Sequence, residues 1–291
     1  MPRMQAPDGY LTSSEAAEIL NCSVAMVYNY EKSGQLHKTV PPGRKQGFFS
    51  ENEVKALSEG LASFFDASLH PTDSKDDGLT FRQATSDDME GVYKVAASLF
   101  GTTTSAEARK PLIEACPEGN YVVERNGQIV AYLHAQPLRH ERMMAFMNGE
   151  IRGKDISVSD LDCFRPGQKS ECLIKSIGAT KQIGATDKDR RANQQRFIMR
   201  LLQGVKAELE EMGSRGIIID KIFGTSETPT GIAMGFSASM QQFGKPLGEG
   251  RFRFVMNVEE SELSIFDPYK EALIKWQKLH GNASIRQKHT T

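Results

Sequence analysis

Cys172-Leu173-Ile174-Lys175-Ser176-Ile177 is a run of apolar and β-branched residues that predicts a strand. A loop and a long amphipathic segment follow it. Five apolar residues at helical spacing mark the expected buried face of that segment: Phe197, Leu201, Leu202, Val205 and Leu209. Gly213 is expected to end the helix, and Gly216-Ile217-Ile218-Ile219-Asp220 predicts a buried strand. A strand, a long helix and a buried strand in this order indicate a mixed α/β domain.

The chain on either side of this unit extends the same pattern. Residues 79–84 predict a strand, residues 85–88 a helix start, and Val92, Val95, Ala96 and Leu99 a helix face. Asn126-Gly127 lies between two strand-like runs, residues 121–125 and 128–133, and is a strong signal for a β-hairpin. Residues 251–256 predict the last strand.

These pieces resemble the GNAT (Gcn5-related N-acetyltransferase) fold. The resemblance rests on Phe81-Arg82-x-Ala84-Thr85-x-x-Asp88, on the Asn126-Gly127 hairpin, on the unit from 172 to 220, and on Thr230-Gly231-Ile232-Ala233-Met234-Gly235-Phe236. It implies a mixed α/β domain with a central, largely antiparallel sheet over residues 79–260. It also implies acetyl-CoA or another anionic ligand as the possible cofactor, although none is required in our main interpretation.

In that family the loop before the long helix binds the pyrophosphate of acetyl-CoA through backbone N–H groups, with glycines that let the backbone come close. The resemblance places Arg190, Arg191, Asn193 and Arg196 in that loop, as cofactor-binding candidates. Asn193 and Gln195 stand where small residues are expected, and the general-acid tyrosine has no counterpart between Gly231 and Gly235. The three arginines indicate either an anion site or a basic, solvated loop.

Two glutamates are the candidates for a general base in that domain. Glu171, or else Glu150, could take a proton from a substrate, although a glutamate near a strand is usually only solvated. The candidate catalytic set is therefore Glu171 at most. We expect acetyl transfer to be absent or very weak.

The N-terminal 65 residues predict a separate small module. Thr12 and Glu15 have the spacing of a capping box before a short helix, and Ser23 can cap a second helix in which Val24, Val27 and Tyr30 share a face. Gly34 can end that helix, and Leu36 returns to the core. Residues 40–49 predict a β-hairpin with a basic tip, and residues 50–53 open a third helix.

This order resembles the excisionase-like and MerR-like winged helix-turn-helix families, on Tyr10-Leu11-Thr12-Ser13-Ser14-Glu15-Ala16-Ala17-Glu18-Ile19-Leu20 and Ser23-x-x-x-Val27-Tyr28-x-Tyr30-x-x-x-Gly34-x-Leu36. The resemblance implies binding to double-stranded DNA, with the second helix in the major groove and the wing on phosphates. The candidate DNA-binding residues are Ser23, Tyr28, Asn29, Lys32, Lys38, Arg44 and Lys45. A three-helix interaction module with a solvated basic loop is the alternative.

Composition limits the remaining possibilities. The 291 residues carry a net charge of -1, so any DNA contact needs a local basic patch rather than overall charge. The four cysteines are scattered and indicate reduced thiols. His134 and His140 lack a third ligand at metal spacing and are expected at the surface or at a strand edge. No apolar run is long enough for a membrane span or a signal peptide, so we expect a cytoplasmic protein without a membrane partner.

The sequence therefore predicts an α+β protein of four parts: residues 1–65, a winged helix-turn-helix domain; 66–78, a linker; 79–260, the GNAT-like domain; and 261–291, a C-terminal helix and tail. Residues 147–169 are an insertion that we expect to be an exposed loop, and Met143, Met144 and Met147 are expected in the core. Our main interpretation is a transcriptional regulator with a GNAT-like sensor or assembly domain. The alternative is an active N-acetyltransferase that the first domain places on DNA.

A homodimer is expected as well, because one winged helix reads only a short half-site. The interface would lie on the larger domain or on the stripe of Tyr269, Leu273 and Trp276 in residues 267–280. That stripe could equally pack on its own domain.

Overall fold

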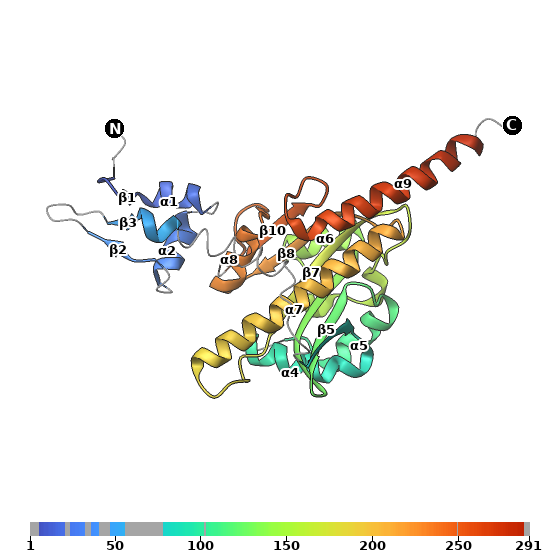
Figure 1. Ribbon diagram of the computed structural model, residues 1–291, viewed down its shortest axis with the longest axis horizontal. Helices are drawn as coiled ribbons and strands as arrows, with labels where there is room; N and C mark the ends of the chain where they lie inside the picture. Colours follow the sequence, from blue (N-terminus) through green and yellow to red (C-terminus); the bar gives the residue numbers. More distant parts are fainter. Residues whose placement is uncertain are drawn as a thin grey trace. The chain divides into compact units, whose positions relative to one another are not determined.

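The computed structural model describes residues 6–20, 24–32, 36–40, 47–55, 78–101, 103–248 and 250–287 (Figure 1). The chain divides into two compact units. One comprises Met1–Ala67 and Ser226–Phe254, and the other Ser68–Thr225 and Val255–Thr291. Most of the expected linker lies outside the described residues, and the domain boundaries expected from the sequence stay a prediction.

The described residues from 6 to 50 form two short helices and three short strands. The elements are β1 (Tyr10–Leu11), α1 (Ser13–Ile19), α2 (Val24–Lys32), β2 (Lys38–Thr39) and β3 (Phe48–Ser50), and the strands pair antiparallel in the order β1-β3-β2. The capping box of Thr12 and Glu15 is present at the start of α1, and Leu36 is buried, as expected. Residues 51–55 are helical, with Val54 buried.

The buried face of α2 differs from the expected one. Val24 is 37% exposed, whereas Met26, Val27 and Tyr30 are buried. Met26, Val27 and Tyr30 lie within an arc of about 100° around the helix axis, and Val24, in the first turn, lies beyond the edge of that arc. Gly34 and the tip of the expected hairpin, residues 41–46, lie outside the described residues.

A sheet of seven strands forms the centre of the larger fold, in the order β4-β5-β6-β7-β8-β10-β9. Its strands are β4 (Leu79–Gln83), β5 (Asn120–Arg125), β6 (Gln128–Leu138), β7 (Lys169–Ala179), β8 (Ile218–Ser226), β9 (Gln241–Gln242) and β10 (Phe252–Asn257). The pairs from β4 to β7 are antiparallel, and β7 and β8 are parallel. The expected mixed α/β fold with a large, mostly antiparallel sheet is confirmed.

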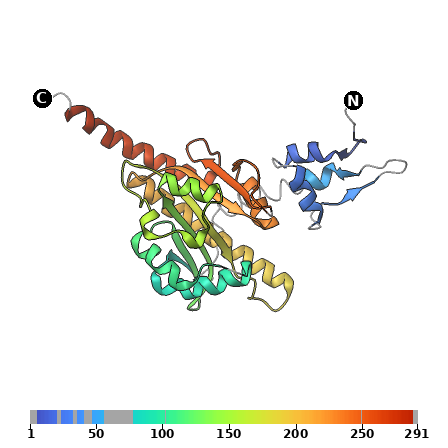
Figure 2. The same ribbon diagram turned by 180° about the vertical axis from the view of Figure 1, so that it is seen from behind.

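Helices cover both faces of this sheet (Figures 1 and 2). The helices that follow β4 in the chain are α4 (Met89–Phe100), α5 (Ala106–Ala115), α6 (His140–Met147), α7 (Asp187–Ser214), α8 (Pro229–Ser237) and α9 (Asp267–Gln287). Val122 packs in a cluster with residues of α4, whereas its neighbour Tyr121 stacks on Phe81, which lies against Gly204 of α7. Successive strand residues point to opposite faces, so α4 and α7 cover opposite sides of the sheet.

The long helix α7 has the expected stripe: Phe197, Leu201, Leu202, Val205 and Leu209 are all buried. It does not end at Gly213, however, because it continues to Ser214. Gly216 has a φ of +76°, its N–H donates to Gly213, and the N–H of Ile217 donates to the carbonyl of Met212. This is the Schellman arrangement, in which a left-handed residue after the helix satisfies the last carbonyls. Gly216 therefore ends the helix.

The first half of α9 packs on its own unit, alongside α7 (Figure 1). The Tyr269 side chain is 1% exposed, and its hydroxyl accepts a hydrogen bond from Ile219 N at 2.7 Å and donates one to Ile217 O at 3.0 Å. Trp276 lies against Gly216. Further along, Leu279 is 75% exposed. Among the described helices, none is both long and apolar enough to cross a membrane.

The insertion at residues 147–169 is not the open loop that we expected. It contains two 3-10 turns, Gly153–Asp155 and Val158–Asp160, and the side chains of Ile156, Leu161 and Phe164 are buried. Its polar residues mostly act locally: Asp160 accepts from the backbone and hydroxyl of Ser157. The polar composition of the segment did not indicate these three buried apolar side chains.

The Tyr269 hydroxyl gives a first prediction for stability. Tyr269→Phe removes the acceptor of a buried backbone N–H and the donor to a buried carbonyl. We expect the free energy of unfolding to fall by about 1–3 kcal/mol, because a buried polar group without a partner loses its hydration uncompensated. Urea denaturation of the full chain measures this change. The control is Tyr93→Phe on α4, at a side chain that is 36% exposed; equal stability of the two variants would contradict the prediction.

Candidate functional site

The N-terminus of α7 is where the resemblance places a cofactor site. In the structure this end is closed by the protein itself. Thr186 caps the helix: its hydroxyl accepts from Asp189 N at 3.2 Å, and the Asp189 carboxylate accepts from Thr186 N at 3.1 Å and from the hydroxyl at 2.7 Å. The hydrogen bonds from Thr186 lower the pKa of Asp189. With Asp187 beside it, the first turn carries two carboxylates.

The expected cofactor-binding residues lie within α7 and not in a loop before it. Arg190, Arg191, Asn193 and Arg196 all follow the helix start at Asp187. The expected loop was wrong because Thr186 and Asp189 form a capping box that starts the helix earlier in the chain.

Their contacts are local. Arg190 pairs with Asp187 at 3.1 Å and donates to Gly184 O at 3.2 Å. The Asn193 amide donates to Ile183 O at 3.1 Å and holds the preceding loop against the helix.

This placement limits what these residues can bind. The N–H of Arg190 already donates to Thr186 O at 3.0 Å, and the later residues lie inside the helix, where each N–H bonds the carbonyl four residues earlier. Backbone N–H groups from 190 to 196 are therefore not available to a pyrophosphate. The positive end of the helix dipole is met by Asp187 and Asp189 instead of by a ligand.

The candidate general bases lie apart from each other. Glu171 is on β7, its side chain is 15% exposed, and it accepts a hydrogen bond from His140 Nδ1 at 2.9 Å if that nitrogen carries the proton. His140 is 67% exposed, as expected for a surface histidine. Glu150 is exposed in the turn after α6. His140 is the described partner of Glu171, and the catalytic role of this glutamate stays a prediction.

The candidate DNA-binding residues are described only in part. Ser23, Arg44 and Lys45 lie outside the described residues, and for Asn29 and Lys32 only the backbone, in α2, is described. Of the remaining two, Lys38 lies over the Tyr28 ring, with its ammonium 5.0 Å from the ring centroid. The Tyr28 hydroxyl donates to Ser13 Oγ at 3.4 Å, so this side chain is held between α1 and β2.

A group of polar side chains is buried at the opposite face of the sheet from α7. His134 of β6 is 2% exposed, which corrects our expectation of a surface position: its strand is central and α5 covers it. Arg109 of α5 is 1% exposed and lies 2.9 Å from His134 Nδ1. Its Nε donates to Thr104 O at 3.0 Å, and another nitrogen donates to Thr103 Oγ1 at 2.9 Å.

A β-bulge brings a third nitrogen base to this group. His134 pairs with Ser176, but the next residue, Ala135, pairs with Ile174, so Lys175 is the extra residue on β7. Such bulges re-aim a side chain. The Lys175 nitrogen is buried without a hydrogen-bond partner, and the lysine's charge acts on both Arg109 and His134.

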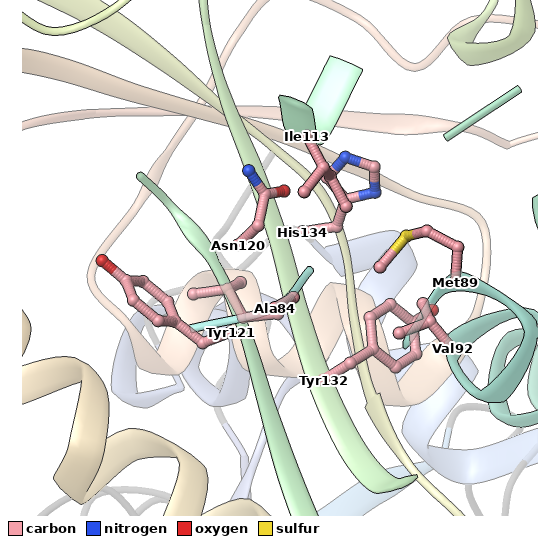
Figure 3. A pocket seen from close by; sticks show the side chains of 9 residues that line it. Ala84, Met89, Val92, Ile113, Asn120, Tyr121, Tyr132 and His134 are labelled. Carbon is pink, nitrogen blue, oxygen red and sulfur yellow. The ribbon is translucent and has the colours of Figure 1, made fainter. Parts of the chain in front are cut away.

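Other polar atoms around this point are also unpaired. His134 Nε2 and both polar atoms of the Gln136 amide, two residues along the same strand, have no partner in the described part of the chain. A cavity of about 10 Å³ adjoins His134 and is lined by Tyr132 and by apolar residues such as Met89 and Ile113 (Figure 3). That volume is at the lower limit for one water molecule.

Burial shifts the protonation of all three bases toward the neutral form. It lowers the pKa of Lys175 to about 8, with a smaller contribution from the charge of Arg109. Burial and the two neighbouring cations hold the pKa of His134 well below 6.5. Burial also lowers the pKa of Arg109, and no carboxylate contributes to any of these shifts. We call Arg109, His134 and Lys175 the buried cationic cluster.

Sequence reasoning missed two members of this cluster. Arg109 lies on α5, which contains Pro111 and was not expected as a helix, although Ser105 caps it in the usual way. Lys175 lies in a predicted strand, where alternation alone does not reveal a bulge.

The cysteines and the possible metal ligands are the remaining chemically reactive side chains. Cys116, Cys163 and Cys172 are free, and the Cys116 and Cys163 thiols are hydrogen-bonding neighbours. Burial raises the pKa of the Cys116 thiol. Cys22 lies outside the described residues. Within the described ranges, no group of three or more histidine, cysteine, aspartate or glutamate side chains could hold a metal ion.

Comparisons with known proteins return only distant similarity. No family model matches the chain, and no curated protein does. Among solved structures, Ard1 from Thermoplasma volcanium is 10% identical, with 62% of this chain and 97% of that chain covered and a TM-score of 0.36. NAA60 from Arabidopsis thaliana in complex with acetyl-CoA is 13% identical, with 62% and 99% covered and a TM-score of 0.38.

The loading GNATL domain of CurA from Lyngbya majuscula is 8% identical, with 62% and 98% covered and a TM-score of 0.41. Identities and TM-scores this low carry no argument about the function of this chain.

The shifted pKa of Lys175 predicts an unusual pH dependence. In the unfolded chain the lysine has a pKa of 10.5, and in the folded chain about 8. Between these values the unfolded chain binds more protons, so a rise in pH favours the folded chain. From pH 8 to pH 10.5, we expect the free energy of unfolding to rise by about 1–3 kcal/mol relative to Lys175→Met.

Urea denaturation at several pH values measures this difference. The control is Lys154→Met, which replaces an exposed lysine of the insertion and should follow the unmodified protein at every pH. Parallel curves for the protein and Lys175→Met would show that the lysine keeps its ordinary pKa.

Proposed function

We propose that the protein is a DNA-binding regulator whose GNAT-like domain senses a ligand and does not transfer acetyl groups. The observation that carries this proposal is the closed N-terminus of α7. Thr186 and Asp189 cap it, Asp187 adds a second carboxylate, and the N–H groups of residues 190–196 lie inside the helix. A site that uses those groups to hold a pyrophosphate would have to unwind the first turns of α7.

The proposed DNA-binding domain is supported by its local chemistry. Two short helices, α1 and α2, precede two paired strands, β2 and β3, and the chain between them contains Arg44 and Lys45. From Lys32 to Lys45 the sequence has no acidic residue, so this segment offers positive charge that the whole chain lacks. Lys38, exposed on β2, would extend the same positive surface.

An active acetyltransferase placed on DNA is the second candidate. It is favoured by the order of the elements, in which the parallel strands β7 and β8 are joined through the long helix α7. This is the unit on which the resemblance to GNAT proteins rests. Fold alone does not determine activity, because the same architecture can carry different sites.

The homodimer is part of the proposal. The first half of the α9 stripe packs on its own unit through Tyr269, so the part of the helix left for a partner is the segment around Leu279, whose side chain is 75% exposed. The rest of the dimer interface would lie on the surface of the larger unit.

Titration with acetyl-CoA separates the two candidates. We expect no heat of binding when acetyl-CoA is added to the full chain, and no acetylation of amines or peptides, because the helix start presents carboxylates to the pyrophosphate. The matched variant is Asp187→Asn with Asp189→Asn, which removes both charges. Turnover by the unmodified protein that is lost in Glu171→Gln or Arg191→Ala would replace our main candidate with the second.

DNA binding has its own test. Arg44→Ala with Lys45→Ala should weaken binding to all duplexes alike and lower the salt slope of log K by about 1–2, because two phosphate contacts are lost. Asn29→Ala should instead change the preferred sequence. The control is Lys94→Ala with Lys275→Ala, at two exposed lysines of the other unit. Unchanged affinity of the Arg44 and Lys45 variant would exclude the wing as a phosphate clamp.

A further inference from the structure

Two cysteines that are far apart in the sequence lie side by side in the larger unit. Cys116 follows α5 directly, and Cys163 lies in the insertion between α6 and β7. The Cys163 thiol donates to Ala115 O at 3.3 Å. In turn, the backbone N–H of Phe164 donates to the Cys116 sulfur, and the two thiols are hydrogen-bonding neighbours. Each sulfur therefore lies against the backbone beside the other cysteine.

Hydrogen bonds hold the backbone at both cysteines. The Cys116 carbonyl accepts from the Asn120 amide at 3.0 Å. One residue before Cys163, the N–H of Asp162 donates to Pro137 O at 3.1 Å, at the end of β6. A disulfide forms without strain only where the backbone already holds two cysteines close together. Two anchored segments with adjacent thiols meet that condition.

We propose that Cys116 and Cys163 form a reversible disulfide when the protein meets hydrogen peroxide, and that this bond fastens the insertion to the end of α5. The two side chains differ in exposure in the way that such a reaction needs. Cys163 is half-buried, so peroxide can reach it, whereas Cys116 is 1% exposed and shielded from solvent. Burial also raises the pKa of the Cys116 thiol. Because the thiolate is the nucleophile, Cys163 reacts first and Cys116 second.

The reaction balances with hydrogen peroxide as the oxidant. The Cys163 thiolate attacks one peroxide oxygen, the O–O bond breaks, and the leaving hydroxide takes up the proton that the thiol had released. The product is a sulfenic acid at Cys163 and one water molecule. The Cys116 sulfur then attacks the Cys163 sulfur, the S–O bond breaks, and the hydroxide leaves with the Cys116 proton as a second water molecule. An added dithiol reverses the reaction by thiol–disulfide exchange.

Cys172 provides an internal comparison. It is buried on β7, and burial raises the pKa of its thiol to about 12, so it is expected to stay reduced. Cys22 lies outside the described residues. The inference goes beyond the proposed function, because the disulfide can be detected whether or not the protein binds DNA or acetyl-CoA.

The experiment treats the reduced full chain with a small excess of hydrogen peroxide, alkylates the remaining thiols, and maps the tryptic peptides by mass spectrometry without reduction. Trypsin cleaves after Lys154 and Lys169, so Cys163 lies in a different peptide from Cys116 and Cys172. We expect a cross-linked pair of peptides that joins Cys116 to Cys163, and alkylation of Cys172. Dithiothreitol should release the two peptides.

The melting temperature gives a second readout. The disulfide restricts the unfolded chain between residues 116 and 163, so the oxidised protein should melt about 5 °C or more above the reduced protein. Cys163→Ser, at a half-buried side chain, should lose both the cross-link and this rise. The matched control, Cys172→Ala, should keep both.

The inference is wrong if Cys116 and Cys163 are both alkylated after peroxide treatment, or if Cys163 pairs with Cys22 or Cys172 instead. Oxidation of Cys163 to a sulfinic acid without a disulfide would reject Cys116 as its partner. A disulfide that lowers the melting temperature would show that the folded chain does not accommodate the bond, and would reject it as a fastening of the insertion. If Cys163→Ser fails to fold, the peptide map of the unmodified protein still decides. None of these results depends on the outcome with DNA or acetyl-CoA, so failure here leaves the proposed function to its own tests.

Discussion

Close packing of α7 on the sheet is the constraint on which the larger fold depends. Gly204 faces Phe81 of β4, and a Cβ at Gly204 would lie 2.2 Å from the ring, so only glycine lets the helix come this near. Around this point the helix buries its apolar stripe, and burial of each large apolar side chain contributes roughly 1.5–3 kcal/mol. A helix fixed on this face can join the parallel strands β7 and β8, and it leaves the other face to α4 and α5.

The same helix decides how the domain could be used. A helix start with free N–H groups attracts anions, but here the Asp189 N–H donates to the Thr186 hydroxyl, and the carboxylates of Asp187 and Asp189 lie in the first turn. The activity of a domain depends on the residues of its site and not on its fold alone. The order of β7, α7 and β8 therefore describes the architecture of this domain and does not by itself indicate acetyl transfer. Arg109 and His134 lie on the opposite face of the sheet, where α5 covers the strand β6.

The sequence predicted the elements whose signals are local and repeated. The stripe of α7 follows from helical spacing, and the hairpin at Asn126 and Gly127 follows from their positive φ values of 50° and 77°, which these residue types tolerate. The start of α7 was misplaced because its capping box uses Asp189 where the usual pattern has a longer acid. The helix end was assigned to Gly213, yet the glycine that adopts the left-handed conformation is Gly216.

The buried cationic cluster could not have been predicted in the same way. Its members come from α5, β6 and β7, and they meet only because the strand register and the bulge at Lys175 place them together. A lone histidine in a strand carries no local sign of burial, and a lysine in a strand usually points to water. Desolvation of an ionised group costs several kcal/mol even after relaxation, whereas an apolar residue of similar size at either position would avoid that cost. Arg109 and Lys175 are therefore basic residues at positions where stability alone favours leucine or methionine.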